Sequence, residues 1–496
     1  ILKGSKRMTM ENGGQWQEDM DIKFHFIVGT PARDVLDIQS LWRTTSRGYA
    51  SIVNDTYFPP RAVSLNANAD AFKIRTAITG HGQQGEFIPR DHFVNIDGGS
   101  KEFQWSVWKE CAENPIYPQG GTWIYDRAGW CPGAPTDLQE FDITDLVTPG
   151  QAHNIDYGMI GASGTSNYVV NNQLVSYGAP NHALDASITD IISPSNYVEY
   201  FRTNAICNNP TVELQNTGST TLTEATIEYW VNGSSTPQTY TWTGSLKFLE
   251  KEKVVLPTPE ALWDDVSGVG TNKFYARVEN PNGLTDEYAF NDQYETEFEV
   301  PEVVPSNFCI VFRTNNAANE SSYELLDDAG NVLLTRDGLS NNTTYRDTFS
   351  LGYGCYQLNI YDTGDDGISF WANNDGSGYA RIWQVGAGVV KMFQGDFGGS
   401  LVYNFTIDFP LTYEEVNNSY PVDLYPNPAN EMFVLTASNI SEANIIMVNQ
   451  MGQMVEVPMT ITNDKITFHT TELPSGIYFV QVDYRGKMIT KKVMVE

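Results

Sequence analysis

Side chains that could bind a sugar concentrate between Asp70 and Gly133. The segment reads FKIRTAITGHGQQGEFIPRDHFVNIDGG and, shortly after, FQWSVWKECAENPIYPQGGTWIYDRAGWCPG. Tryptophan rings can stack on the C–H faces of sugars while neighbouring charged groups hold the hydroxyls. The same rings could instead fill the core of a sandwich, so both interpretations stay open for each of them. The four tryptophans concerned are Trp105, Trp108, Trp123 and Trp130.

A run of carboxylates on a glycine-rich turn is the second group that could bind a ligand. The stretch YDTGDDGISFW contains Asp362, Asp365 and Asp366. Calcium prefers roughly six to eight oxygen ligands in a flexible geometry, and clustered carboxylates can supply them. The bidentate glutamate of an EF-hand loop is missing. The stretch is therefore either a structural calcium site of another type or a solvated acidic turn.

Several other kinds of catalytic or binding centre are not indicated. The sequence contains neither a GxSxG nucleophile motif nor an HExxH zinc motif. Its five cysteines form no CxxC pair and have no histidine at metal-ligand spacing, so disulfides in an oxidising compartment are expected instead of zinc. The 496 residues include 61 acidic and 30 basic side chains, a formal net charge of −31, which argues against a nucleic-acid partner. No apolar run reaches about 18 residues, so we expect no membrane span.

The elements that must position these side chains are strands. Segments of alternating polarity separated by Gly, Pro, Asn and Asp recur throughout, and long stretches of helical periodicity are almost absent. The predicted fold class is all-β, with a jelly roll followed by immunoglobulin-like and β-sandwich modules in tandem. The predicted parts are a jelly roll at 21–203, an immunoglobulin-like sandwich at 204–300, a sandwich with the acidic turn at 301–409, a linker at 410–421 and a small C-terminal sandwich at 422–496.

The tract CAENPIYPQGGTWIYDRAGWCPG, preceded by ITGHG, GEF and IVGTPARDVLDI, resembles the second jelly roll of the peptide-N-glycosidase F family. The resemblance covers roughly residues 11–200, and its most specific part runs from Asp126 to Gly133 with Cys111 upstream. Members of this family are amidases that remove N-linked glycans from asparagine. The resemblance therefore implies N-glycoproteins or glycans as partners and no cofactor for the amidase step.

The resemblance also implies roles for two charged residues. Hydrolysis of a glycosyl-asparagine amide needs a water, a carboxylate that positions and deprotonates it, and donors for the developing oxyanion. The second-roll glutamate of similar proteins matches Glu86 in GEF, and their cleft arginine matches Arg127. Taken without the resemblance, Glu86 is an ordinary solvated carboxylate, and Arg127 is a structural partner of Asp126 or Asp91.

Other parts of the implied site match less well. Glu11 stands at the right distance before GTP to match the first-roll glutamate, but its flanking residues differ. The family's catalytic aspartate has no counterpart, and we expect it in an upstream jelly roll of which residues 1–20 would be the remnant. His81 replaces a tryptophan of the best-known member, and we expect it to line the substrate cleft with Trp123 and Trp130. A histidine beside a glycine could also be a plain turn residue.

The cysteines suggest two bridges. Cys111 and Cys131 enclose a loop of about 20 residues, and a bridge there would restrict the unfolded chain by about 3 kcal/mol. These two positions are bonded in the resembling family. Cys309 and Cys355 could bridge across the third module, whereas Cys207 has no obvious partner.

The C-terminal module carries a second resemblance. The motifs YPNPANEMFVL, NIIMVNQMGQMV, LPSGIYFVQV and KKVMVE closely resemble the type A sorting domain of the type IX secretion system. This resemblance implies that the protein crosses the outer membrane with that machinery and is secreted or held at the cell surface. Lys487, Lys491 and Lys492 place positive charge on the last strand, which could pair by edge addition with a transport partner. A plain accessory sandwich is the alternative.

The expected function is that of a secreted peptide-N-glycosidase-like amidase which hydrolyses the glycosyl-asparagine amide of N-glycoproteins. Whether the chain is an enzyme is left open, because the aspartate-bearing domain is not in this sequence. The alternative is a non-catalytic glycan-binding or adhesin protein on the same scaffold, since a fold does not fix a function.

Overall fold

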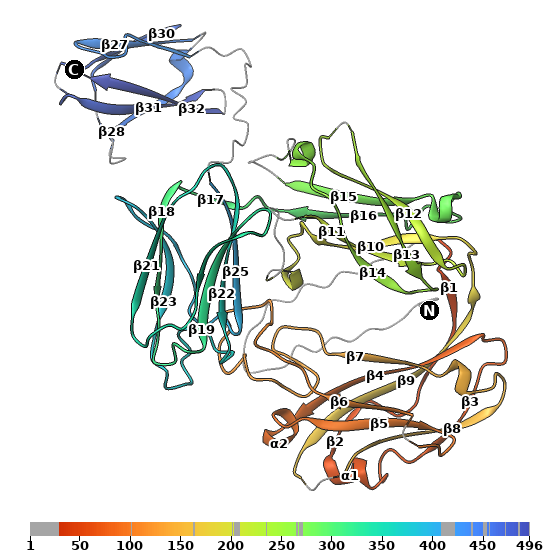
Figure 1. Ribbon diagram of the computed structural model, residues 1–496. Coiled ribbons are helices and arrows are strands. Elements are labelled where there is room, and N and C mark those ends of the chain that lie inside the picture. The colour runs from red at the N-terminus through yellow and green to blue at the C-terminus, as the bar shows by residue number, and fades with distance from the viewer. Residues whose placement is uncertain are drawn as a thin grey trace. The chain divides into compact units, whose positions relative to one another are not determined.

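The computed structural model shows a chain made almost wholly of strands, which confirms the predicted all-β class (Figure 1). It describes residues 29–407 and 422–495, apart from gaps at 101, 162–163, 201, 203–208, 235, 264–265, 267–270, 438–439, 450–453, 456, 472 and 485–486. The predicted remnant at 1–20 with Glu11, Cys207 and the predicted linker at 410–421 thus lie outside the described residues. The chain divides into two compact units, Ile1–Leu411 and Thr412–Glu496.

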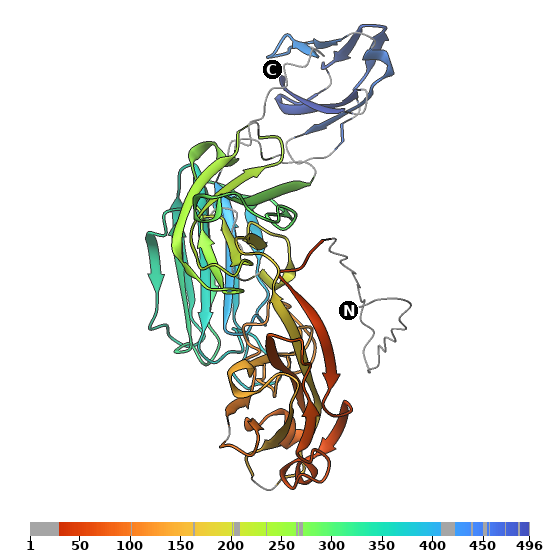
Figure 2. The ribbon, with the colours of Figure 1, turned by 90° about the vertical axis from the view of Figure 1, so that its right-hand side faces the viewer.

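The first module is a jelly roll of two antiparallel sheets. One sheet has the order β1-β9-β4-β7 with β2 also paired to β9, and the other has the order β3-β8-β5-β6. Figure 2 shows β1 and β9, in red and yellow, running side by side. The elements are β1 (Arg33–Ser40), β2 (Thr45–Gly48), α1 (Tyr49–Val53), β3 (Arg61–Ser64), β4 (Ala71–His81), α2 (Gln83–Glu86), β5 (Arg90–Ile96), β6 (Phe103–Val107), β7 (Leu138–Asp142), η1 (Thr144–Leu146), β8 (Ala152–Met159) and β9 (Asn167–Pro180).

Strand β4 shows why these residues form a sandwich. Its eleven residues alternate without a break between half-buried and buried side chains. Phe72, Ile74 and Ile78 face the core between the two sheets, while the intervening residues face outward. Because β4 pairs with β9 along its whole length, the end of the strand at His81 is placed in a fixed register.

The second module is a sandwich with a three-stranded and a four-stranded sheet, in the orders β10-β11-β14 and β13-β12-β15-β16. Strand β10 pairs with β11, so strand pairing joins residues 186–193 to this module, although the sequence analysis extends the jelly roll to residue 203. The elements are β10 (Ala186–Ser193), η2 (Val198–Tyr200), β11 (Thr211–Asn216), β12 (Leu222–Val231), β13 (Gln238–Leu246), β14 (Lys251–Val255), η3 (Glu260–Trp263), β15 (Asn272–Glu279), η4 (Pro281–Gly283) and β16 (Gln293–Phe298).

The third module is a sandwich of two larger sheets, in the orders β17-β25-β22-β19-β20 and β21-β18-β23-β24. Aromatic and aliphatic side chains of both sheets fill the space between them. The elements are β17 (Glu302–Val304), β18 (Asn307–Arg313), β19 (Ser321–Asp327), β20 (Val332–Arg336), β21 (Thr344–Ser350), β22 (Gly354–Asp362), β23 (Tyr379–Gln384), β24 (Gly388–Met392) and β25 (Ser400–Ile407).

The predicted Cys309–Cys355 bridge is wrong. Cys309 is a free and buried thiol, and Cys355 is disulfide-bonded but not to Cys309. The reason is the two-residue period of a strand. Phe308 and Ile310 face the core from β18, so Cys309 between them faces the other side of its sheet. Leu358 faces the core from β22, and Cys355, three positions earlier, also faces outward. A bond through the sandwich is therefore impossible.

The C-terminal unit is a small sandwich with sheets in the orders β26-β27-β30-β29 and β28-β31-β32. The side chain of Asn427 donates to the carbonyl of Lys492 (2.8 Å), and the amide of Ala429 donates to the carbonyl of Met494 (2.7 Å). These bonds occupy the last residues of the β32 edge. A further strand that added to this edge would therefore have to pair with the earlier part of β32. The elements are β26 (Asp423–Tyr425), β27 (Met432–Thr436), η5 (Ile440–Glu442), β28 (Asn444–Asn449), β29 (Met459–Thr462), β30 (Lys465–His469), β31 (Gly476–Tyr484) and β32 (Lys487–Val495).

No helix in the described part of the chain has the length and apolar character needed to cross a membrane.

A buried histidine makes the stability of the jelly roll depend on pH. His92 lies in the core, with Nδ1 2.8 Å from the hydroxyl of Tyr157, and burial lowers its pKa to about 3. As the pH falls from about 6.5 toward 3, the unfolded chain binds a proton here that the folded chain does not, so the free energy of unfolding decreases.

We therefore predict that this free energy falls by about 2 kcal/mol between pH 7 and pH 5 on account of His92 alone. In His92→Asn, where an amide replaces Nδ1, this part of the pH dependence disappears, whatever the constant cost of the smaller side chain. Hydrogen exchange of the β5 and β8 amides at both pH values measures it. An equal pH dependence in the two proteins would contradict the prediction.

Candidate functional site

The candidate site lies where the end of β4 and the short helix α2 meet the loop of residues 109–133. The amide of Gly80 donates to the carbonyl of Ala128 (2.9 Å), and the amide of Ala128 donates to the carbonyl of Glu86 (2.9 Å). Lys109 and Arg127 exchange two main-chain hydrogen bonds, 2.8 and 3.0 Å long, which close the loop on itself. The predicted Cys111–Cys131 disulfide is confirmed and joins the two sides of the loop a few residues further on.

Two glycines allow this close approach. A Cβ atom on Gly80 would lie 2.0 Å from the carbonyl oxygen of Gly85, and one on Gly129 would lie 2.1 Å from that of Ile78. Gly129 also has a φ of +78°, which disfavours any other residue. Gly80 of ITGHG and Gly129 of the most specific sequence tract therefore allow main-chain contact at the end of β4.

Arg127 and Glu86 form the ion pair at the centre of the site. Arg127 Nε donates to Glu86 Oε1 at 2.9 Å, and the two side chains are 6% and 20% exposed. Arg127 Nη1 and Nη2 donate to the main-chain carbonyls of residues 122, 123 and 125 at 2.8, 3.3 and 2.5 Å, respectively. With three further N–H groups directed at carbonyls, the guanidinium is held in a fixed orientation toward Glu86. From the sequence alone, Asp126 or Asp91 is the expected structural partner of Arg127. In the structure, the partner is Glu86.

His81 and Trp130 stand next to this pair. Their ring centroids are 5.9 Å apart, and the Arg127 guanidinium lies 5.2 Å from the Trp130 ring centroid. Trp130 Nε1 donates to the carbonyl of Gly80 (3.2 Å), and His81 Nε2 lies 2.8 Å from the hydroxyl oxygen of Thr79. Burial lowers the pKa of His81, and the charge of Glu86 opposes this only in part, so His81 is neutral near pH 7.

Two cavities lie beside the loop that carries Arg127, and Glu86 lines neither of them. One has a volume of about 730 Å³ and is lined by His81, Arg127, Trp130 and the glycine-rich run 119–122. The other, of about 610 Å³, is lined by Phe87, Trp108, Tyr125 and other residues of the first module together with residues 364–366 of the third. Both volumes lie within the range of cavities that bind small ligands. The structure therefore brings Glu86, Arg127, His81 and Trp130 together.

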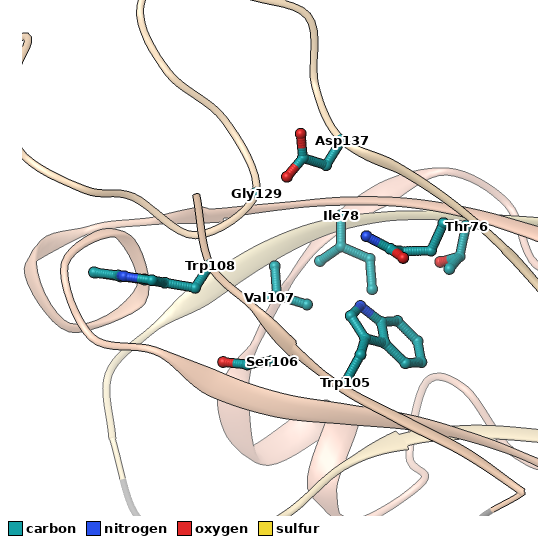
Figure 3. Close-up of a pocket in the computed structure, with 9 residues that line it drawn as sticks. Thr76, Ile78, Trp105, Ser106, Val107, Trp108, Gly129 and Asp137 are labelled. Carbon is teal, nitrogen blue, oxygen red and sulfur yellow. The ribbon is translucent and has the colours of Figure 1, made fainter. Parts of the chain in front are cut away.

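The four tryptophans divide between the two interpretations that the sequence left open. Trp105 packs beside the core of the jelly roll, and Figure 3 shows it beside Ile78, with Trp108 pointing away. The cavity that Ile78, Trp105 and Trp108 line has a volume of about 20 Å³, which is enough for about one water molecule and for no larger ligand. Trp108 and Trp130 each line one of the large cavities.

Trp123 is fully buried, and its side chain contacts the third module. Its Nε1 donates to Asp396 Oδ1 (2.9 Å), and its ring stacks against Tyr117. In the opposite direction, Trp371 Nε1 of the third module donates to the carbonyl of Gly121 (2.8 Å). Trp123 also lines the cavity beside His81, so its expected contact with substrate stays a prediction, while its buried ring supports the loop.

Arg202 is a second contact between these modules, and sequence reasoning did not single it out. It is buried, and its guanidinium donates to the carbonyls of Ala112 (3.1 Å) and Asn114 (2.8 Å) in the loop. It also donates to the carbonyls of Phe397 (2.9 Å) and Ser400 in the third module. Arg202 lies outside the motif tract, and its hydrogen-bond acceptors are main-chain carbonyls, although its guanidinium also lies 3.9 Å from Glu113 Oε2 and 4.2 Å from the Tyr117 ring centroid.

The acidic turn also differs from its prediction. Asp362 and Asp366 lie in one cluster with Glu320, with carboxylate oxygens within 4.8 Å of one another, and this cluster could hold a cation. Asp365, which has a φ of 64°, instead lines the cavity beside Tyr125. Glu320 reaches the cluster because Ser321 is paired with Asp362 between β19 and β22. Burial, together with the charges of Asp366 and Glu320, raises the pKa of Asp362 to about 7.

The contact between β4 and the loop can be tested with two glycine-to-alanine variants. Gly129 and Gly121 have φ values of +78° and +76°, so alanine at either position carries a similar conformational cost of about 1 kcal/mol. At Gly121 a Cβ atom meets nothing within 4 Å, whereas at Gly129 it meets the Ile78 carbonyl. We predict that Gly129→Ala loses about 2–4 kcal/mol and Gly121→Ala about 1 kcal/mol, measured by hydrogen exchange at Gly80 and Ala128. Equal losses would contradict the proposed contact.

Comparison with known proteins finds two family matches. Residues 48–179 match the family described as "Peptide-N-glycosidase F, C terminal", and residues 423–496 match the "Secretion system C-terminal sorting domain". No curated protein matches the chain.

Three solved structures are among those similar to the chain. PNGase F, a glycosylasparaginase from Flavobacterium meningosepticum, is 22% identical with a TM-score of 0.26, and the match covers 30% of this chain and 54% of that one. A peptide-N(4)-(N-acetyl-beta-D-glucosaminyl) asparagine amidase is 22% identical with a TM-score of 0.26, covering 28% and 51%. PNGF-II is 21% identical with a TM-score of 0.20, covering 23% and 24%. The chain thus spans about half the length of the first two structures.

The jelly roll and the C-terminal sandwich are therefore the modules in which the two family matches lie. The second match marks the protein for export by the type IX secretion system, to the cell surface or into the medium. Residues 48–179 of the first module thus match the peptide-N-glycosidase F C-terminal family, and residues 423–496 match the secretion-system sorting domain.

Proposed function

We propose that this chain contributes the second-roll part of an amidase site that hydrolyses the glycosyl-asparagine amide of N-glycoproteins. The observation that carries the proposal is the Glu86–Arg127 pair, with its 2.9 Å contact, in which Arg127 lines a cavity of about 730 Å³. The family match over residues 48–179 supplies the reaction class.

The reaction needs little more than well-placed polar groups. Water attacks the side-chain amide carbon of asparagine, the C–N bond breaks, and an aspartate and a glycosylamine are formed. In this proposal the carboxylate of Glu86 holds the water or a sugar hydroxyl, because its side chain is still 20% exposed. Arg127 fixes the orientation of that carboxylate, and its own orientation is fixed by three carbonyls. Glu11 and an aspartate of a preceding domain would complete the site.

The cavity beside His81 is proposed to take the sugar. Trp130 presents an aromatic ring to it, and neutral His81 can accept or donate a hydrogen bond to a hydroxyl. The cavity beside Tyr125 is lined in part by the third module, so that module forms part of the substrate cleft in this proposal.

The non-catalytic alternative has an observation in its favour. Arg127 directs its donors at Glu86 and at main-chain carbonyls, which is what a purely structural pair would also do. In that case the protein would bind glycans without releasing them. The two functions differ in whether a bound glycopeptide is cleaved.

We predict that Glu86→Gln lowers kcat on a denatured N-glycoprotein about 10²–10⁴-fold, because the isosteric amide cannot act as a base. The measurement is release of glycans over time by the protein expressed from its whole coding sequence. Glu102→Gln is the matched control, since Glu102 is an exposed glutamate of the same module that is not paired with Arg127, and it should keep full activity. Undiminished activity of Glu86→Gln would remove Glu86 from the mechanism, and intact glycans with the native protein would favour the binding alternative.

A further inference from the structure

A second group of carboxylates lies where the chain passes from the jelly roll into the second sandwich. Asp185 immediately precedes β10, and Asp286 and Asp292 lie on the segment that connects η4 to β16. Each contributes one oxygen, and these oxygens lie within 4.8 Å of one another. Asp185 is 1% exposed and Asp292 is 6% exposed, so this is not an acidic patch on the surface.

Buried oxygen atoms of this group lack partners. Within the part of the chain that the structure describes, Asp185 Oδ1 and Asp292 Oδ1 have no hydrogen-bond donor, and neither does Oδ1 of the adjoining Asn291. Asn291 Nδ2 donates to Asp185 Oδ2 (3.2 Å), so the amide side chain contacts the group. An unpaired buried acceptor costs roughly 1–3 kcal/mol. Three of them in one place indicate that a ligand of opposite polarity belongs there.

The charge of the group is also uncompensated. No Lys or Arg among the described residues forms an ion pair with any of the three aspartates, and the nearby Arg277 pairs with Glu228 and Glu279 instead. The three carboxylates, whose oxygens lie within 4.8 Å of one another, therefore repel one another when they are charged. The repulsion can be relieved in two ways, by a proton shared between carboxylates or by a cation.

We propose that Asp185, Asp286 and Asp292 bind one calcium ion. The three candidate ligand atoms are carboxylate oxygens, which calcium prefers, and no His or Cys is part of the group, as zinc or copper would require. The amides of Ala186 and Tyr288 hold the two oxygens of Asp286, at 2.9 and 2.7 Å, and so fix that carboxylate in place. Residues on both sides of the junction supply the ligands.

The bound ion would fasten the junction between the two modules. Segment 182–186 connects the jelly roll to the second sandwich. Segment 284–292 of the second sandwich contacts segment 182–186. One main-chain bond already joins them, from the amide of Glu287 to the carbonyl of Leu184 (3.1 Å), and Glu287 Oε2 accepts from the amide of Ala183 (2.8 Å). Binding of calcium to the folded junction only should therefore protect both segments from opening.

The test compares the full chain in calcium and in chelator at pH 7.5, with hydrogen exchange read at segments 182–186 and 284–292. At a calcium concentration about 100 times the dissociation constant, exchange should be about 100-fold slower in the native protein. Asp292→Asn should abolish this difference and remove one calcium per chain in a binding titration. Asp366→Asn is the matched control, because it changes the separate cluster in the third module and should leave the difference in both segments unchanged.

Two results would overturn the proposal. Equal exchange of the native protein in calcium and in chelator excludes a cation, and this comparison does not depend on whether the variant folds. If protection from hydrogen exchange instead increases on acidification and does not depend on calcium, the carboxylates share a proton. Magnesium chloride in place of calcium serves as the probe for the identity of the ion, and equal protection by magnesium would contradict a calcium site.

Discussion

The burial of one charge, the guanidinium of Arg127, constrains the rest of the candidate site. A charge that is 6% exposed is stable only if its donors are satisfied, and here a carboxylate and three main-chain carbonyls satisfy them. Those carbonyls converge only if residues 122–125 curve around the guanidinium. That curvature in turn requires the loop to lie directly on the end of β4, where Gly80 and Gly129 leave no room for a side chain. The Cys111–Cys131 bond closes the same loop.

The third module takes part in this arrangement and is more than a spacer. Trp123 and Trp371 exchange contacts between it and the loop, and Arg202 binds carbonyls on both sides. The first three modules accordingly form one compact unit, whereas the sorting domain forms another. A loop supported in this way presents its cavities with little freedom, so binding of a ligand there would require little ordering of the protein.

Much of this could be predicted from the sequence, and the exceptions have physical causes. Alternating polarity along the sequence predicted the all-β class. The tract from Asp126 to Gly133, with Cys111 upstream, predicted the jelly roll and its disulfide. The predicted Cys309–Cys355 bridge was wrong because successive side chains of a strand lie on opposite faces of the sheet. The sequence of one segment does not reveal which of its alternate residues face the core. Glu320 was missed because only the register of β19 on β22 brings it to Asp362. Arg202 binds main-chain oxygens, which every residue has.

The central claim is that the site hydrolyses an amide and does not merely bind a glycan. Its most direct test is to incubate a defined N-glycopeptide with the protein expressed from its whole coding sequence, in water enriched in heavy oxygen, and to analyse the peptide by mass spectrometry. Amide hydrolysis predicts conversion of the glycosylated asparagine to aspartate with one oxygen taken from the labelled water. A peptide that keeps its glycan, or that keeps a single sugar on an unlabelled asparagine, would contradict the account.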